Sequence, residues 1–371
     1  MSIFQVELKK VVDDSYEIEI GFDLKQKLAS DLRAGLLGGV TNFAVITDST
    51  VAPLYAEPIS QLLRSAGYRV ETFVFPAGEE QKTRETKAML EDAMLEKEFR
   101  RDCAVLAIGG GVVTDLAGFL AGTFARGVPF VNYATTLLAA ADASVGGKTA
   151  VDTPRATNLI GLFNQPKKVY IDVAAWQTLP PRQVASGLAE TIKHACLAHP
   201  GFFEVLEEKM EDILALDAEA CMHIAQENCK IKYEVVMQDE RESGMREILN
   251  LGHTVGRAVE TLSGYRLLHG EAVALGLVAQ CKLSRHLGYL TEHDEQRVIT
   301  LLQRADLPTR LPEYVDPQAL VKKLYTDKKV RDGQLRFVVQ KGIGGMVEFS
   351  PGVFSAPMEE PLILKLLEQM K

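Results

Sequence analysis

The segment ADASVGGKTAVD, residues 141–152, contains a lysine whose setting could bind a phosphate. Residues 146–149 match the end of a P-loop, G-x-x-x-x-G-K-[ST]. A P-loop places its first glycine five residues before Gly147, where this chain has Asp142, a carboxylate that would repel phosphate. A P-loop also follows a strand directly and opens a helix, whereas TTLLAAADAS intervenes here. The sequence therefore argues against an ATPase or GTPase and leaves Lys148 for another task.

Acidic and imidazole side chains on three apolar helical segments could hold a divalent metal ion. Glu190 lies in LAETIKH, His253 lies in REILNLGHTVGRAVE, and His269 opens the apolar segment of LLHGEAVALGL. One carboxylate and two imidazoles form a His-His-Glu set that leaves a fourth position open for water or substrate. We therefore predict a metal site at these three residues, although each histidine taken alone could be structural.

Further polar residues accompany the predicted metal ligands. Lys193 lies three residues after Glu190 on the same helix face, and Asn250, His253 and Arg257 form a polar stripe at spacings of three and four. Buried polar groups need partners, so we expect this stripe to face a ligand. The other histidines lack such a setting and are expected on solvated faces: His194, His199, His223, His286 and His293.

A glycine-rich strand end, CAVLAIGGGVVTD, is a candidate nucleotide site, with a helix that begins near Val112. Ligands of open α/β sheets bind at the carboxyl ends of strands, and a helix N-terminus attracts phosphates. The pattern is not G-x-G-x-x-G, and a tight turn alone would also explain it. Asp48 ends another strand in VITDST, where it could bind a ribose hydroxyl or cap the following helix.

The order of elements predicts an α/β fold followed by helices. Five apolar runs in the first half are typical of buried parallel strands: NFAVITD, RVETFVF, CAVLAIGGG, PFVNYATT and KVYID. Helical patterns separate several of these strands, and after TLPPRQ nearly all segments have helical periodicity. We expect an α/β nucleotide-binding domain at residues 1–176 with a mostly parallel sheet. An all-helical metal- and substrate-binding domain is expected at 177–371, with one small hairpin in RFVVQKGIGGMVEFS.

Composition excludes some classes of protein. The 371 residues are 47% hydrophobic and 25% charged with net charge -9, which argues against a nucleic-acid-binding surface. No apolar run reaches the ~18 residues of a membrane span, and the N-terminus has no signal-peptide core. Five scattered cysteines form no C-x-x-C pair. We expect a cytoplasmic protein with reduced thiols and no contact with nucleic acid or membrane.

Four longer segments occur together and in order: GGGVVTDLAGFLAGTFARGVPFVNYATTLLAAADASVGGKTAVD, SGLAETIKHACL, IKYEVVMQDERESGMREILNLGHT and LLHGEAVALG. From about Asp48 to Lys329, the chain resembles the dehydroquinate synthase family of sugar-phosphate cyclases. The resemblance implies a nucleotide-binding domain joined to a helical domain, a homodimer, bound NAD and one zinc or cobalt ion. It also implies a carbon–oxygen lyase activity of the shikimate pathway, which leads to chorismate and the aromatic amino acids.

The activity that the resemblance implies converts DAHP, a seven-carbon keto-acid sugar phosphate, to 3-dehydroquinate and phosphate. NAD takes a hydride from a ring carbon, and the resulting ketone acidifies the neighbouring C–H so that phosphate leaves by elimination. The hydride then returns, the ring opens, and an intramolecular aldol reaction closes the carbocycle. NAD is regenerated in each turnover.

The resemblance implies roles for individual residues. Donors to the phosphate and ring oxygens would be Lys148, Asn158 and Asn250, with charge added by Arg257, Lys328 and a partner subunit's Arg126. Arg246 and Lys232 would clamp the substrate carboxylate, which suits a guanidinium, and Lys193 and Asp142 would contact ring hydroxyls. The cofactor residues, in addition to Lys148, would be Asp48, Glu79, Lys82, Gly110, Gly111, Val112, Asp115, Thr135, Thr136 and Thr178.

Four positions depart from the family pattern: Thr114 for glycine, Ala134 for proline, Thr157 for lysine and Arg257 for histidine. These changes leave open a sister cyclase that acts on a carboxylate-free heptulose phosphate. A metal- and NAD-dependent polyol dehydrogenase is a second alternative, which would accumulate NADH. A non-enzymatic nucleotide-binding module would leave the Glu190, His253 and His269 set unexplained.

Overall fold

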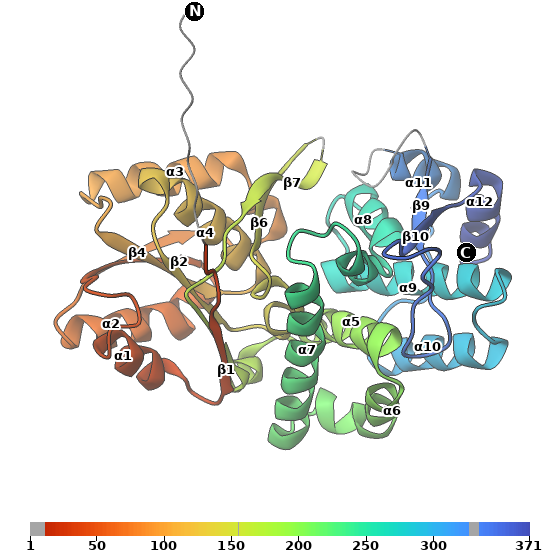
Figure 1. The fold of residues 1–371 in the computed structure, drawn as a ribbon, viewed down its shortest axis with the longest axis horizontal. Coiled ribbons are helices and arrows are strands. Elements are labelled where there is room, and N and C mark those ends of the chain that lie inside the picture. Colours follow the sequence, from red (N-terminus) through yellow and green to blue (C-terminus); the bar gives the residue numbers. More distant parts are fainter. Residues whose placement is uncertain (1–11, 155, 326–333) are drawn as a thin grey trace, which may run out of the picture.

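The computed structural model describes residues 12–154, 156–325 and 334–371, arranged as two halves that lie side by side (Figure 1). The N-terminal half contains a six-stranded sheet covered by helices, and the C-terminal half is mostly helical. The predicted fold class is therefore confirmed. Lys328, a predicted site residue, lies outside the described residues.

The main sheet is parallel throughout, in the order β1-β8-β5-β4-β2-β3. Its strands are β1 (Glu17–Gly21), β2 (Asn42–Asp48), β3 (Arg69–Phe75), β4 (Cys103–Gly109), β5 (Phe130–Ala134) and β8 (Lys168–Asp172). The five predicted strands are all present. Strand β1 was not predicted, because its sequence EIEIG alternates charged and apolar residues at one edge of the sheet.

Helices cover both faces of this sheet. In β2, Phe43 and Val45 pack in the core beneath α1 (Lys25–Arg33) and α2 (Glu57–Ser65). Their neighbours Ala44 and Ile46 pack with α3 (Arg84–Glu96) and α4 (Gly111–Thr123) on the other face. Successive side chains of a strand point to opposite faces, so a strand buried on both sides is apolar at every position.

An antiparallel hairpin of β6 (Lys148–Thr153) and β7 (Ala156–Phe163) lies outside the main sheet and was not predicted. It packs on α4 and lies on the side of the sheet half that faces the helices (Figure 1). Lys148 is the first residue of β6, a strand, where a P-loop would begin a helix. The prediction that this segment is not a P-loop is thus confirmed.

The C-terminal half consists of α5 (Pro181–Ala198), α6 (Pro200–Leu214), α7 (Ala218–Gln238), α8 (His253–Leu262), α9 (His269–His286), α10 (Glu292–Arg304), α11 (Pro317–Leu324) and α12 (Glu360–Glu368). Its core continues into the sheet half, because Val169 and Ile171 of β8 share one apolar cluster with Leu188 and Ile192 of α5. The segment η5 (Val173–Thr178) joins β8 to α5. Among the described residues, no helix is long and apolar enough to span a membrane.

Two details of this half differ from the sequence prediction. The segment expected as one helix around His253 is divided: the 3₁₀ segment η6 (Met245–Asn250) ends before α8 begins, and Gly252 lies between them at φ 78°. The predicted hairpin is present in a short form, since Gln340 and Met346 form an antiparallel bridge and the Val347 N–H donates to the Val339 carbonyl oxygen. The additional antiparallel pairing of β9 (Arg336–Val338) with β10 (Ser355–Pro357) was not predicted.

Glycines let α5, α8 and α9 cross at short range. A Cβ at Gly276 of α9 would overlap the carbonyl oxygen of Gly252, and one at Gly256 of α8 would lie 2.9 Å from the Ala272 carbonyl oxygen. Gly270 of α9 likewise lies directly against the main chain of Ser186 in α5. Because these crossings lie close to Glu190, His253 and His269, they set the spacing of the predicted metal ligands.

Substituting Gly276→Ala is therefore expected to force α9 away from the start of α8. Overpacking with backbone shifts costs about 1–3 kcal/mol, so the melting temperature should fall and zinc binding should weaken together. Gly39→Ala is the matched control, since a Cβ there meets nothing within 4 Å. Unchanged zinc affinity in a folded Gly276→Ala protein would show that the crossing does not set the ligand spacing.

Candidate active site and metal centre

Three buried helices bring the predicted metal ligands together. Glu190 of α5 is completely buried, and His253 and His269 are the first residues of α8 and α9. The Nε2 atoms of both histidines lie 3.4 Å from Glu190 Oε1. One ligand atom from each of the three residues lies within 4.8 Å of the others, so this set can surround a single ion.

The remaining atoms of the two imidazoles orient them for this task. His253 Nδ1 lies 3.2 Å from the Leu251 carbonyl oxygen, which can only accept, so the Nδ1 atom carries the proton and Nε2 presents a lone pair. His269 Nδ1 lies 3.2 Å from the Glu260 carboxylate. Carbonyl or carboxylate partners behind histidine ligands are the usual support of a zinc site.

Charge at this centre also fits a cation. The carboxylate of Glu190 is buried, the ammonium group of Lys193 pairs with its Oε2 atom, and both imidazole Nε2 atoms lie 3.4 Å from its Oε1 atom. Burial opposes its ionisation, but Lys193 and His253 hold the pKa of Glu190 below its usual value. Burial is outweighed at His269 too, where Glu260 and Glu190 raise the pKa to about 10. The imidazole of His269 is thus protonated on both nitrogen atoms in the metal-free protein, and a divalent ion must displace the proton on Nε2.

A second set of possible ligands is Asp142, Glu190 and His194. Two ammonium groups already serve these carboxylates: Lys232 pairs with Asp142, and Lys193 pairs with Glu190 and lies 3.9 Å from Asp142. A divalent ion would be repelled there, so the set with His253 and His269 is the better metal site.

The expectation that His194 lies on a solvated face was wrong, since its side chain is fully buried. Its Nδ1 atom lies 3.0 Å from Asn228 Oδ1, and Asn228 in turn donates to Thr191 Oγ1. Burial lowers the pKa of His194 to about 3, so this imidazole is neutral. The error arose because α5 is buried around its whole circumference, which a search for one apolar face does not anticipate.

A cavity of about 340 Å³ lies beside the metal ligands, between the hairpin and the helical half. The predicted site residues that line it are Asp115, Asp142, Lys148, Asn158, Lys232, Arg246, Asn250, His253 and Arg257. They come from segments up to about 140 residues apart and include many of the residues assigned to substrate. Arg126 is exposed and is not among the lining residues of this cavity.

One wall of the cavity carries a carboxylate that was not predicted from the sequence. Glu242, at φ 58°, lies 2.5 Å from Lys148 Nζ and accepts a hydrogen bond of 2.7 Å from Asn250 Nδ2. Its loop follows α7 and is held by Asp239, which accepts from the main-chain N–H groups of Ser243, Gly244 and Arg246. In the sequence, Glu242 is one acidic residue of DERESG, and nothing there distinguishes it from a solvated charge.

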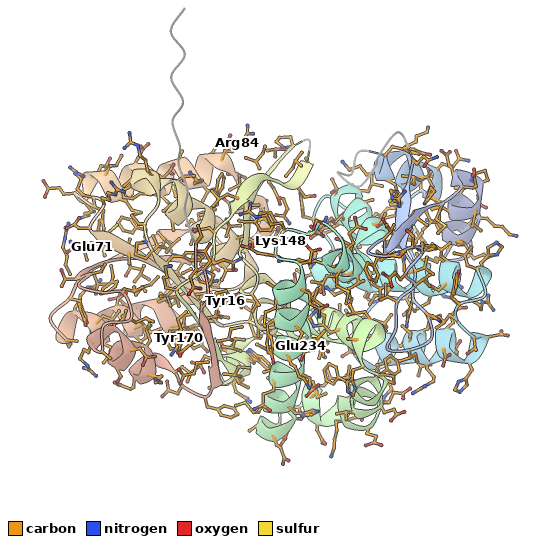
Figure 2. All side chains as sticks on the ribbon, in the orientation of Figure 1. Tyr16, Glu71, Arg84, Lys148, Tyr170 and Glu234 are labelled. Atoms are coloured by element: carbon orange, nitrogen blue, oxygen red, sulfur yellow. The ribbon has the colours of Figure 1, made fainter. Side chains whose placement is uncertain are left out.

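Gly146, before Lys148, contacts the guanidinium of Arg246 and is not part of a phosphate-binding loop. Arg246 is fully buried and donates from Nη2 to the Gly146 carbonyl oxygen at 2.9 Å. The Gly146 N–H donates to Tyr16 Oη, and a Cβ at Gly146 would lie 2.5 Å from the guanidinium. Figure 2 shows Tyr16 and Lys148 near the junction of the two halves. Burial, with Arg246 and Lys232 nearby, lowers the pKa of Lys148 to about 7 against the effect of Glu242.

The predicted cofactor residues lie mainly at the carboxyl ends of the sheet strands. Gly110 and Gly111 follow β4 at the start of α4, and Thr135 and Thr136 follow β5. The Thr135 hydroxyl is buried without a hydrogen-bond partner among the described residues, whereas Thr136 caps the following turn by accepting from Ala139 N. These residues form one edge of the sheet, as a nucleotide site there requires.

Two other predicted cofactor residues have structural partners. Asp48 ends β2 and accepts from the N–H groups of Thr50 and Val51, which matches the alternative of a helix cap. The Thr178 hydroxyl lies 2.8 Å from the hydroxyl of Tyr55. These contacts neither require nor exclude a nucleotide.

The last group of predicted cofactor residues is a buried ionic cluster. Lys82 pairs with Glu79 and lies 3.6 Å from Asp115 Oδ2 and 3.7 Å from Asp152 Oδ2. Asp152 was not predicted. Burial raises the pKa of Asp115 to about 7 against the effect of Lys82. Asp115 also lines the cavity, so this cluster adjoins the substrate-sized space.

Removing either imidazole should abolish metal binding at this centre. We expect His253→Ala and His269→Ala to lose zinc on dialysis, because each removes one of three ligands. His293→Ala is the control, since that side chain is 81% exposed and distant from the set. Elemental analysis after dialysis measures the outcome, and a full equivalent of zinc in either variant would contradict the assignment.

Comparisons with known proteins agree with this arrangement. Residues 72–186 match the family model for the 3-dehydroquinate synthase N-terminal domain, and residues 187–330 match the C-terminal one. The chain is 46% identical over 331 residues to the 3-dehydroquinate synthase of Citrifermentans bemidjiense, covering 89% of this chain and 91% of that protein. It is 45% identical over 370 residues to the one from Pelobacter propionicus, covering 99% of this chain and 100% of the relative.

Solved structures of related cyclases share the whole fold. The 2-epi-5-epi-valiolone synthase from Streptomyces hygroscopicus subsp. jinggangensis, with NAD+ and Zn2+ bound, is 28% identical, has a TM-score of 0.87 and covers 99% of both chains. A 2-deoxy-scyllo-inosose synthase complexed with carbaglucose-6-phosphate, NAD+ and Co2+ has a TM-score of 0.87 at 24% identity, covering 95% of this chain and 96% of that one, and shows the shared fold. The sequence identity to the curated relatives and the extent of the match establish that this chain belongs to the 3-dehydroquinate synthase family.

Proposed function

We propose that this protein is a 3-dehydroquinate synthase, which converts DAHP to 3-dehydroquinate and phosphate. The observation that carries the proposal is the cavity itself. It places five basic side chains, those of Lys148, Lys232, Arg241, Arg246 and Arg257, beside a buried Glu-His-His set. A substrate that carries a phosphate, a carboxylate and vicinal oxygen atoms matches that combination. The curated relatives at about 45% identity carry the same function in their names.

The residues present fit the cofactors of the structural neighbours. The neighbours bind NAD+ with Zn2+ or Co2+, and the donors of Glu190, His253 and His269 suit either ion. The carboxyl edge of the sheet, with Gly110 and Gly111 at the start of α4, suits the dinucleotide. When bound, NAD would accept and return a hydride, and the ion would acidify an alcohol and polarise a ketone.

The protein's own residues would bind and orient the substrate. Lys148, Asn158 and Asn250 would donate to the phosphate, for which Arg257 supplies a permanent charge that a histidine lacks. A phosphate at Lys148 and Asn250 must displace the Glu242 carboxylate, which now holds both. The substrate phosphate would thereby replace Glu242 as the anionic partner of Lys148. Fixed donors of this kind act by positioning and electrostatics.

The opposite end of the substrate would meet Arg246 and Lys232. Arg246 has its Nε atom buried without a hydrogen-bond partner among the described residues, so part of its fork remains for a carboxylate. Lys232 and Lys193 both lie near Asp142. When substrate binds, these three side chains would give up their contacts with one another and bind its ring hydroxyls and its carboxylate.

The wider setting of the enzyme is also proposed. We propose a homodimer in which Arg126 serves the neighbouring subunit, because this exposed side chain is absent from the lining of the cavity in its own chain. A cytoplasmic location is supported by five free, buried cysteines. The reaction class would be that of a carbon–oxygen lyase in the shikimate pathway, and the partner a small sugar phosphate rather than nucleic acid or membrane.

The alternatives predict different chemistry. A valiolone-type or inosose-type cyclase acts on a substrate without the carboxylate and has no use for a buried guanidinium at Arg246. A polyol dehydrogenase would build up NADH in step with product and needs no phosphate site. Both are weaker than dehydroquinate synthesis because the curated relatives with nearly full coverage carry the latter name.

Substitution of Arg246→Ala tests the substrate assignment. Truncating one member of a buried charge pair costs about 2–5 kcal/mol, and each 1.4 kcal/mol is about tenfold, so catalytic efficiency on DAHP should fall by at least one to three orders of magnitude. Arg241→Ala is the matched control, because that arginine lines the same cavity but is 73% exposed. Phosphate release is measured from DAHP and from a carboxylate-free heptulose phosphate.

Two controls make the result decisive. Because Arg246 also supports the Gly146 and Glu240 carbonyl oxygens, the melting temperature and zinc content of the variant must be measured, together with those of Arg246→Lys. Preference of the unmutated protein for the carboxylate-free sugar, or full DAHP turnover by folded Arg246→Ala, would overturn the dehydroquinate synthase proposal. Steady accumulation of NADH would favour the dehydrogenase.

A further inference from the structure

Asp152 is a buried carboxylate for which the proposed chemistry has no role. Its side chain lies on β6, is 8% exposed, and adjoins the register shift between Val151 and Thr153. Its main-chain N–H donates to the Lys82 carbonyl oxygen at 2.6 Å, and Thr83 pairs with it as an isolated parallel bridge. The hairpin is thus fastened to the segment that carries the ionic cluster of Lys82.

The carboxylate of Asp152 reaches in two directions. Oδ1 accepts a hydrogen bond of 2.7 Å from the main-chain N–H of Asn158, on the facing strand β7. Oδ2 lies 3.7 Å from Lys82 Nζ and has no hydrogen-bond donor among the described residues. One side chain therefore joins the cofactor side of the site to a residue of the substrate cavity.

Asn158 needs such support. Its backbone adopts φ 53°, in the left-handed region that non-glycine residues enter only when the surroundings hold them there. Its side chain lines the cavity, and its Oδ1 atom is buried without a partner among the described residues. Since the backbone conformation decides where the side chain points, the bond from Asn158 N to Asp152 fixes the direction of the Asn158 amide.

Electrostatics alone do not explain the carboxylate of Asp152. Lys82 already pairs with Glu79 and lies near Asp115, so Asp152 is a third carboxylate around one ammonium group. Burial, with the repulsion of Glu79, raises the pKa of Asp152 despite Lys82. The contact that holds the Asp152 carboxylate toward β7 is the 2.7 Å hydrogen bond from the Asn158 N–H to Oδ1.

We propose that Asp152 is a positioning residue that holds Asn158 in its left-handed conformation and so aims the Asn158 amide at the phosphate of the substrate. The part that concerns phosphate rests on the proposed function; the part that concerns the conformation of Asn158 does not. The proposal requires a side-chain acceptor at position 152. An aspartate or an asparagine can accept the hydrogen bond from the Asn158 N–H, whereas an alanine cannot.

Steady-state kinetics of the enzyme loaded with NAD and zinc test the proposal. Asp152→Ala is expected to raise KM for DAHP about tenfold or more, the loss that accompanies one hydrogen bond to a charged group, with a smaller change in kcat. Asp152→Asn should stay within about threefold of the unmutated enzyme, because its amide oxygen still accepts the bond. Thr153→Val is the control, because it removes a neighbouring hydroxyl of the same strand whose hydrogen bonds join it to the main chain of Ala156.

A double-mutant cycle separates positioning from a general loss of stability. Asn158→Ala alone should raise KM as Asp152→Ala does. The double variant should be no worse than the poorer single variant, because both substitutions remove the contact between the Asn158 amide and the substrate phosphate. Multiplied effects in the double variant would overturn the proposal. So would an Asp152→Asn enzyme as impaired as Asp152→Ala.

Hydrogen exchange gives a readout that does not depend on activity. Protection of the 156–163 segment should be lost in Asp152→Ala and retained in Asp152→Asn, in the folded protein at a common temperature. If the unmutated protein fails to release phosphate from DAHP, the proposed function is wrong and exchange alone decides on Asp152. Unchanged protection in folded Asp152→Ala would then overturn the positioning role.

Discussion

A single carboxylate with no access to water, that of Glu190, sets the requirements that the helical half must meet. An ionised carboxylate in such a place is costly unless positive charge lies against it. Lys193 supplies one charge from the same helix, and the imidazoles of His253 and His269 converge on the other side. The arrangement is complete only when a proton or a metal ion lies between carboxylate and imidazoles.

The packing of the three helices follows from this requirement. Imidazoles at the first residues of α8 and α9 can reach a carboxylate in the middle of α5 only if the helices cross at short range. Gly256, Gly270 and Gly276 provide that close approach, and Gly252 in the left-handed conformation separates η6 from α8. The close crossing and the charge arrangement are therefore one feature, and a change to either should disturb both.

The substrate cavity follows the same rule of internal compensation. The chain has net charge -9, yet Lys148, Lys232, Arg246 and Arg257 gather around one cavity. Internal acceptors hold three of these side chains: Asp142 pairs with Lys232, Glu242 pairs with Lys148, and main-chain carbonyl groups bind Arg246. A substrate with a phosphate and a carboxylate would exchange these internal contacts for its own. Such a pocket selects an anion locally, without a basic surface.

The sequence was most informative where residues are buried on a regular element. Strands β2, β3, β4, β5 and β8 were predicted because they are apolar at nearly every position, and Glu190, His253 and His269 stood out against apolar helices. Edge strand β1 and the hairpin of β6 and β7 were missed because their mixed polarity resembles loops. His194 was misplaced because α5 has no solvated face.

Two residues of the site could not have been found from the sequence. Glu242 and Asp152 lie in segments of ordinary polar composition. Glu242 matters through its contacts with Lys148, 94 residues away, and with Asn250 across a turn, and Asp152 matters through its contact with Asn158 across the hairpin. Sequence patterns reveal burial through hydrophobic periodicity, but they carry little information about which acidic side chain meets which cation.

The most direct test of the metal centre is anomalous diffraction from crystals of the protein grown with zinc, collected on both sides of the zinc absorption edge. We expect one peak bounded by the Glu190 carboxylate and the Nε2 atoms of His253 and His269, with Nδ1 of His269 still bonded to Glu260. A peak among Asp142, Glu190 and His194, or a Glu190 site that holds no zinc at saturating concentration, would contradict this expectation.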